Sequence, residues 1–135
     1  IPKRDWSSDV CSSDLPPAVA ASCLAAIEVL ETEPQLIDRL WENTHFFKSG
    51  LQALGFNTGA SESPITPVIV GDATLAMRLS DDLFTRGVFA QGIGFPTVPR
   101  GKARVRTIVT ATHTRAELEF ALDCFRAVGH DLGVI

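Results

Sequence analysis

A loop bounded by proline and glycine that runs into a strand, residues 92–106, is the feature that most constrains the fold of this chain. Pro96 and Pro99 fix their own φ angles, and the glycines around them permit bends. The loop is therefore expected to hold a defined shape. It leads into a strand on which Arg104 and Arg106 share one face, because side chains alternate along a strand with a period of two.

Spacing alone leaves two interpretations of these arginines open. The planar fork of an arginine suits a carboxylate, because it donates two parallel charge-assisted hydrogen bonds. A pair of solvated charges on an exposed strand face gives the same pattern.

Hydrophobic periodicity predicts two helices followed by a small mixed unit. The first helix is expected over residues 16–33 and the second ends near residue 54, with a broad apolar surface around Trp41. A third helix is expected over 72–86, and the capping box Thr114-Arg-Ala-Glu117 starts the last one.

Three short apolar runs predict strands. They cover residues 65–70, 88–91 and 104–110. The expected fold class is α+β, with long helices followed by a small, mainly antiparallel sheet that helices back. In this division residues 15–56 connect to a further domain and residues 57–135 form the small α+β domain.

Composition fits an ordinary globular domain, with 45% hydrophobic and 21% charged residues. A net charge of −4 without a basic stripe speaks against nucleic acid, and no apolar run is long enough for a membrane span. Cys23 and Cys124 lie on apolar helical faces and are expected to be reduced core residues of a cytoplasmic protein. No spacing suggests a metal site.

The first fourteen residues are predicted to be foreign to the rest. Residues 5–15 read Asp-Trp-Ser-Ser-Asp-Val-Cys-Ser-Ser-Asp-Leu, which resembles one translated frame of a constant sequencing adaptor. The Ser/Asp/Cys cluster gives no nucleophile, because no histidine stands near it in sequence to act as a base. Residues 1–14 are therefore interpreted as an assembly scar.

Several separated motifs, in one order, resemble the carboxyl-terminal end of the α-oxoamine synthases. They are Leu15-Pro-Pro-Ala-Val-Ala-Ala, Pro64-Ile-Thr-Pro-Val-Ile-Val-Gly-Asp72, the loop and strand at 95–114, and Val128-Gly-His-Asp-Leu-Gly-Val-Ile135. The resemblance covers residues 15–135 and is closest to glycine C-acetyltransferase, also called 2-amino-3-ketobutyrate CoA ligase. It implies the small domain of a fold-type I enzyme that uses pyridoxal 5'-phosphate.

This resemblance implies a homodimer that condenses glycine with acetyl-CoA to 2-amino-3-oxobutanoate and CoA. It implies that Arg106 holds the carboxylate of the amino acid, which orients the substrate for reaction. Thr97 matches the place where the lid of the family meets the acyl end of CoA, so its hydroxyl either contacts the acyl group or only shapes the lid. Arg104 is kept as structural, and no residue is assigned to catalysis, cofactor or metal.

Two further positions bear on chemistry. In the 8-amino-7-oxononanoate synthases, a basic residue near the position of Gly94 can suit a longer, carboxylated acyl chain. Gly94 carries no such charge, so the sequence favours a small acyl group such as acetyl. His113 is interpreted as a helix-start residue, because nothing in the sequence directs a substrate toward it.

Lysine decides whether this chain can act alone. The cofactor chemistry needs a lysine that forms a Schiff base, and only Lys3, Lys48 and Lys102 are present. None of them matches the cofactor lysine of the family, so the chain by itself is predicted to be inactive. The alternatives are another α-oxoamine synthase, such as 8-amino-7-oxononanoate synthase, or a stand-alone α+β module that binds a carboxylate.

Overall fold

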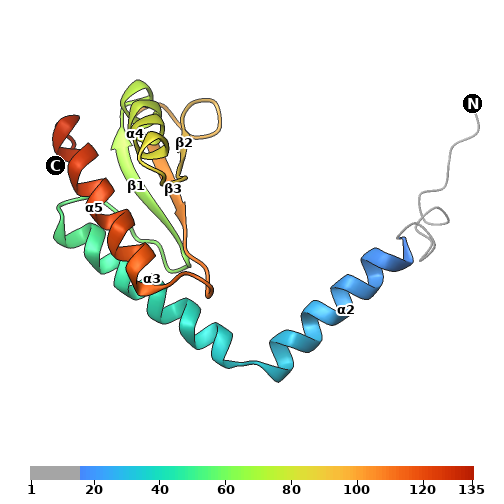
Figure 1. The fold of residues 1–135 in the computed structure, drawn as a ribbon. Helices are drawn as coiled ribbons and strands as arrows, with labels where there is room; N and C mark the ends of the chain where they lie inside the picture. The colour runs from blue at the N-terminus through green and yellow to red at the C-terminus, as the bar shows by residue number, and fades with distance from the viewer. Residues whose placement is uncertain (1–15) are drawn as a thin grey trace, which may run out of the picture. The chain divides into compact units, whose positions relative to one another are not determined.

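The computed structural model describes residues 16–135, and the predicted scar at 1–14 lies outside these described residues. The chain divides into two units, residues 1–36 and 37–135, and each is considered by itself. Figure 1 shows the order of the helices and strands along the chain. Within residues 16–135, no helix combines the length and the apolar character that crossing a bilayer requires.

The described part of the first unit contains the helix α2 (Pro17–Thr32). Proline is tolerated at this start because the first N–H groups of a helix have no intrahelical acceptor. No residue of α2 is buried, and Leu24, Ile27 and Leu30 are each more than half exposed. Cys23 is exposed as well, so the prediction that it is a core cysteine is wrong. A helix that is apolar on all sides is normally buried, so α2 lacks its cover here.

The second unit is a three-stranded antiparallel sheet with helices against it (Figure 1). Its elements are α3 (Gln35–Ala53), whose first two residues fall in the first unit, β1 (Ile65–Gly71), α4 (Ala73–Thr85), β2 (Gln91–Ile93), β3 (Ala103–Ile108) and α5 (Arg115–Asp131). The strand order is β1-β3-β2, and both pairs are antiparallel. This arrangement confirms the predicted α+β class with a small antiparallel sheet.

One face of the sheet builds the core. Val68 of β1 lies opposite Val105 of β3, and both side chains are fully buried. They belong to one apolar cluster with residues of the three helices α3, α4 and α5. The ring of Phe125 on α5 meets Phe47 and Phe56 edge-on, at centroid distances of 6.0 and 5.8 Å. Because all three helices share this cluster, the opposite face of the sheet is left open.

The second strand begins later than its sequence predicted. The expected strand at 88–91 is observed at Gln91–Ile93, because helix α4 and its end take up the backbone groups before it. The hydroxyl of Ser80 donates to the carbonyl of Ala90 at 2.6 Å, and the N–H of Val88 donates to the carbonyl of Leu83 at 2.9 Å.

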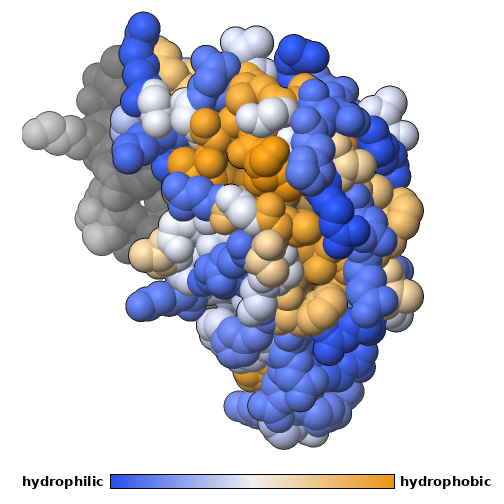
Figure 2. All heavy atoms as spheres, turned by 90° about the vertical axis from the view of Figure 1, so that its left-hand side faces the viewer, coloured by the Kyte–Doolittle hydropathy of each residue, from blue (hydrophilic) through white to orange (hydrophobic). Residues whose placement is uncertain are grey.

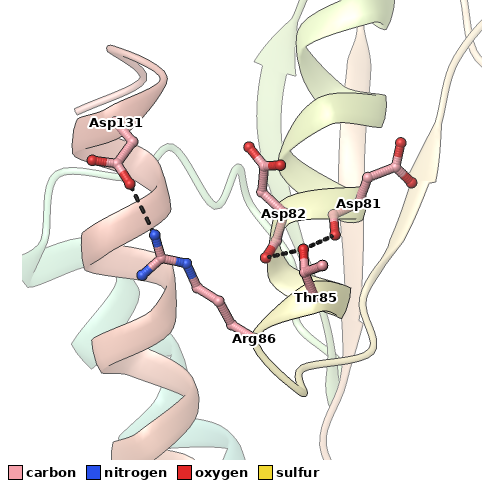
Figure 3. A network of polar contacts seen from close by, with 5 residues as sticks. All are labelled: Asp81, Asp82, Thr85, Arg86 and Asp131. Atoms are coloured by element: carbon pink, nitrogen blue, oxygen red, sulfur yellow. Dashed lines mark hydrogen bonds and ion pairs between the residues drawn. The ribbon is translucent and has the colours of Figure 1, made fainter.

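Helix ends follow local capping chemistry. The side chain of Asp72 accepts a hydrogen bond from the N–H of Leu75 at 2.8 Å, which fixes the start of α4. The predicted capping box at Thr114 is present and starts α5. At the other ends of these helices, Arg86 and Asp131 form an ion pair at 2.9 Å (Figure 3). Both side chains are largely exposed, so apolar packing rather than this pair holds α4 against α5.

Apolar surface also remains exposed in the second unit. Phe84 and Phe89 are 67% and 82% exposed, although their rings lie edge-on to each other with their centroids 6.3 Å apart. Figure 2 shows one face of the chain on which apolar residues gather among hydrophilic ones. Phe46 on α3 is half-buried, and the guanidinium carbon of Arg115 lies 3.6 Å from the centroid of its ring.

The packing of the core predicts that two phenylalanines of α5 contribute very differently to the free energy of unfolding. Replacing Phe125 by alanine should destabilise the chain by about 3–5 kcal/mol, since it removes a buried ring and leaves a cavity. The matched change Phe120→Ala on the same helix, at a ring that is 54% exposed, should cost well under half of that. Urea unfolding followed by circular dichroism measures both, and equal losses would contradict this description of the core.

The capping box predicts a pH dependence. The backbone N–H and the hydroxyl of Thr114 donate to the carboxylate of Glu117 and lower the pKa of that carboxyl below its ordinary value. Because the folded pKa is lowered, the stabilisation is present above the unfolded pKa of about 4.3 and is lost as the pH falls through the folded pKa. Glu117→Gln should therefore lower the melting temperature at pH 7 and leave it unchanged at strongly acidic pH. Glu119→Gln is the control, since that carboxylate makes no hydrogen bond within residues 16–135; an equal effect at pH 7 would refute the assignment.

Candidate functional site

The open face of the sheet carries the two arginines. On β3 the side chains of Ala103, Val105 and Thr107 are buried, so Arg104 and Arg106 point to the opposite side. This confirms the alternation that the sequence predicted. Arg106 is exposed and Arg104 is half-buried.

The strand register gives Arg106 one polar neighbour. It lies directly opposite Pro67 on β1 and directly opposite Gln91 on β2. The Nη2 atom of Arg106 donates to the Oε1 atom of Gln91 at 2.9 Å. Proline offers no polar side-chain atom, so Gln91 supplies the only cross-strand side-chain bond to this guanidinium among the described residues. Sequence reasoning did not single out Gln91, because a polar residue at the start of a strand carries no signal without the register.

Arg104 is held differently, although it shares the same face. Its Nε atom donates to the backbone carbonyl of Lys102 at 3.2 Å, and its cross-strand neighbours are Ile69 and Ile93. The bond to Lys102 directs one edge of the fork back toward its own chain. This placement fits the structural role that the sequence analysis gave to Arg104.

The loop between β2 and β3 holds Thr97 away from Arg106. Thr97 is exposed, within a turn that the bond from the Val98 N–H to the Gly94 carbonyl closes at 3.2 Å. The Phe95–Pro96 peptide bond is cis, and the guanidinium of Arg100 lies 4.9 Å above the ring of Phe95. The loop is thus shaped, as the prolines predicted. Thr97 lies beyond the Ile93 end of the hairpin and Arg106 at its Gln91 end, so the structure does not bring them together.

Glycines of this hairpin allow a close approach to α4. A Cβ atom at Gly92 would lie 3.0 Å from the carbonyl oxygen of Ala76 and from the sulfur of Met77. A Cβ atom at Gly94 would lie 3.1 Å from the Cβ atom of Ala73. Packing against the helix is therefore a sufficient reason for glycine at position 94, and its lack of charge is a weak guide to the acyl group.

A cavity of about 640 Å³ opens beside Arg106, and no pattern in the sequence predicted it. It lies between residues 87–91, the end of β3 and the first turns of α5. Its lining is mainly apolar and includes Phe89, Ile108, Val109 and Phe120. Gln91 and Arg106 contribute polar groups to the same cavity.

His113 is part of the turn before α5. Its Nδ1 atom accepts a hydrogen bond from the N–H of Thr110 at 3.1 Å. The side-chain amide of Asn43 donates to the carbonyls of both Thr110 and His113, at 3.1 and 2.9 Å. These contacts confirm the helix-start interpretation, because they tie the imidazole and its backbone into the turn.

The lysines of the described part do not fit a pyridoxal phosphate site. The Nζ atom of Lys48 on α3 donates to the backbone carbonyl of Ser61, and Lys102 is exposed in the loop before β3. Neither contacts Arg106 or Gln91 within residues 16–135. This part of the chain therefore supplies no lysine for the cofactor at the arginine, and no reaction step is assigned to it.

Comparison with known proteins identifies the family. The family model for aminotransferase class I and II matches residues 3–125. This match covers most of the chain and begins within the segment interpreted as a scar, whose foreign origin stays a prediction.

Curated relatives narrow the comparison. An 8-amino-7-oxononanoate synthase of Symbiobacterium thermophilum is 66% identical over 124 residues, which is 92% of this chain and 32% of the relative. A Thermus thermophilus protein named 8-amino-7-oxononanoate synthase/2-amino-3-ketobutyrate coenzyme A ligase is 54% identical, over 92% of this chain and 31% of the relative. The chain thus spans about a third of the length of the relatives it matches.

A solved structure shows the same fold in a larger enzyme. The serine palmitoyltransferase of S. paucimobilis, solved with pyridoxal phosphate bound as its adduct with myriocin, superposes with a TM-score of 0.85. The sequences are 32% identical over 90% of this chain and 31% of that chain. The chain therefore belongs to the aminotransferase class I and II family, and it corresponds to the carboxyl-terminal part of a pyridoxal-phosphate-dependent α-oxoamine synthase.

Proposed function

We propose that this chain is the carboxyl-terminal part of an 8-amino-7-oxononanoate synthase. The full-length protein, meaning a gene product that contains this chain, would condense alanine with a pimeloyl thioester, with loss of CO₂ and release of the thiol. The observation that carries this proposal is the identity of 66% and 61% to two relatives of that name. This choice replaces glycine and acetyl-CoA, which the sequence analysis preferred.

Within this proposal, Arg106 has a substrate-binding role, which its position in the sheet supports. The guanidinium of Arg106 is exposed on the open face of the sheet, and its one bond within the described residues goes to a neutral amide. An uncompensated arginine fork suits the carboxylate of an amino acid, which it would fix in one orientation. Thr97, exposed on the loop at the other end of the hairpin, remains a proposed contact for the acyl group.

The rest of the site would come from outside this chain. Pyridoxal phosphate, on which the family depends, supplies the stabilisation of a carbanion at the α-carbon of the amino acid. The lysine that would hold it is proposed to lie in the two thirds of the relatives that this chain does not span. The exposed apolar residues of α2 support such a larger partner and speak against a stand-alone carboxylate-binding module. A homodimer in the cytoplasm remains part of the proposal.

A second activity has a specific observation in its favour. The Thermus thermophilus relative carries both names, 8-amino-7-oxononanoate synthase and 2-amino-3-ketobutyrate coenzyme A ligase. Condensation of glycine with acetyl-CoA is therefore a second candidate for the same site. Because both amino acids carry the same carboxylate, Arg106 would serve either reaction.

Substrate preference tests the proposed function. The full-length protein should give its highest kcat/KM with alanine and pimeloyl-CoA, compared with glycine and acetyl-CoA and with the two mixed pairs. The 135-residue chain alone should give no product with any pair, because residues 16–135 supply no lysine for the cofactor beside Arg106. A higher kcat/KM for glycine with acetyl-CoA would decide for the second candidate.

Paired substitutions test the role of Arg106. In the full-length protein, Arg106→Met should raise the KM for the amino acid about 10- to 100-fold, the range expected for losing charge-assisted hydrogen bonds. The KM for the acyl donor should stay nearly constant. Arg104→Met, on the same strand face, is the matched control and should change the amino-acid KM less than about threefold, since Arg104 bonds to its own backbone neighbour. Equal effects of the two substitutions on the amino-acid KM would remove the special role of Arg106.

A further inference from the structure

The bond between Gln91 and Arg106 differs from the other hydrogen bonds that join an arginine to a polar side chain within the described residues. Arg86 and Arg126 pair with the carboxylates of Asp131 and Asp123, at 2.9 and 2.7 Å, so an opposite charge balances each. Arg115 lies over an aromatic ring. Arg106 bonds to an uncharged amide, which fixes one nitrogen of the fork without reducing its positive charge.

The bond leaves donors of the guanidinium free. An arginine side chain carries five N–H donors, and the guanidinium of Arg106 makes only one hydrogen bond within residues 16–135. An exposed arginine also has large rotamer freedom, which it must lose when it binds a ligand. A neighbour that holds the fork before binding reduces that loss of entropy, because part of the ordering has already occurred.

The backbone around Gln91 is itself anchored to α4. On one side, the carbonyl of Ala90 accepts the hydroxyl of Ser80 at 2.6 Å. On the other side, Gly92 lies so close to α4 that an added Cβ atom would contact the sulfur of Met77 at 3.0 Å. Helix α4 thus fixes the backbone of the residue that holds Arg106.

We propose that Gln91 is a positioning residue, which holds the guanidinium of Arg106 in the orientation that receives the carboxylate of the amino-acid substrate. This inference rests on the proposed function, because it needs Arg106 as the carboxylate-binding residue. Gln91 acts through Arg106, and its neutral amide is the property that matters: it accepts a hydrogen bond and leaves the charge available for the ligand.

Steady-state kinetics of the full-length protein test this role. Gln91→Met keeps the length of the side chain and removes the acceptor, so it should raise the amino-acid KM about five- to tenfold with kcat nearly constant. Gln91→Glu keeps the acceptor but adds a negative charge beside Arg106, and it should raise the amino-acid KM at least as much. The control is Gln52→Met, which breaks a bond of equal length, from the amide of Gln52 to the hydroxyl of Thr58 at 2.9 Å, on α3. It should leave both constants unchanged.

A double-mutant cycle separates positioning from a merely structural effect. Arg106→Lys should raise the amino-acid KM, and Gln91→Met should add almost nothing to it, because the shorter, point-like cation no longer presents the fork that Gln91 holds. Circular dichroism of each variant confirms that it folds, and Gln91→Glu carries the test if Gln91→Met does not fold.

Three results would overturn the proposal, and they are distinguishable. An unchanged amino-acid KM in Arg106→Lys would remove the carboxylate site itself, and the positioning role with it. A raised KM in Arg106→Lys, together with an amino-acid KM within about twofold of the wild type in both Gln91→Met and Gln91→Glu, would remove the role of Gln91 alone. Gln91→Met could also raise the amino-acid KM by the same factor in the wild type and in the Arg106→Lys variant. That result would remove the positioning role of Gln91, because the two residues would then act independently.

Discussion

The position of β3 between two antiparallel neighbours is the constraint on which the rest of the second unit depends. Its inner side chains, Val105 among them, are buried in the cluster that holds the three helices together. Burying one side of a strand forces the alternate residues to the other side, since a slip by one residue would exchange the two sets. The apolar requirement of the core thereby places Arg104 and Arg106 on the open face, where a ligand can reach them.

The neighbours of each arginine then decide what its charge can do. Arg104 lies between two isoleucines and bonds to its own backbone, whereas Arg106 lies between a proline and a glutamine. Only Arg106 of this pair is thus held by a neutral side chain. Two arginines of one motif, two residues apart, acquire different roles because the register of β1 and β2 gives them different partners. Under the proposed function, these different partners divide the roles of two residues of the same type, so that only Arg106 binds the substrate carboxylate.

The open surfaces of the chain agree with its share of the longer relatives. Helix α2 exposes its apolar residues, and Phe89 stands 82% exposed beside the cavity next to Arg106. Large exposed apolar areas mark surfaces that another part of a protein normally covers. The chain spans about a third of the length of its relatives. Under the proposed function, the rest of the full-length protein would supply the cofactor lysine and would also cover these exposed apolar residues. Under that proposal Arg106 would contact the carboxylate that alanine and glycine share, so Arg106 itself would not distinguish the two substrates.

The sequence by itself determined the elements and the face of the arginines. Local patterns predicted these features, because such patterns need only residues that are close in sequence. They are the hydrophobic periodicity of α5, the capping box at Thr114 and the alternation on β3. The resemblance of several motifs also singles out Arg106 without reference to its neighbours in space. Only the tertiary structure decided that β2 starts at Gln91 and that Gln91 faces Arg106. The physical reason is that Ser80 and the close packing at Gly92 tie this segment to α4, and such contacts between distant residues leave no periodic signal in the sequence.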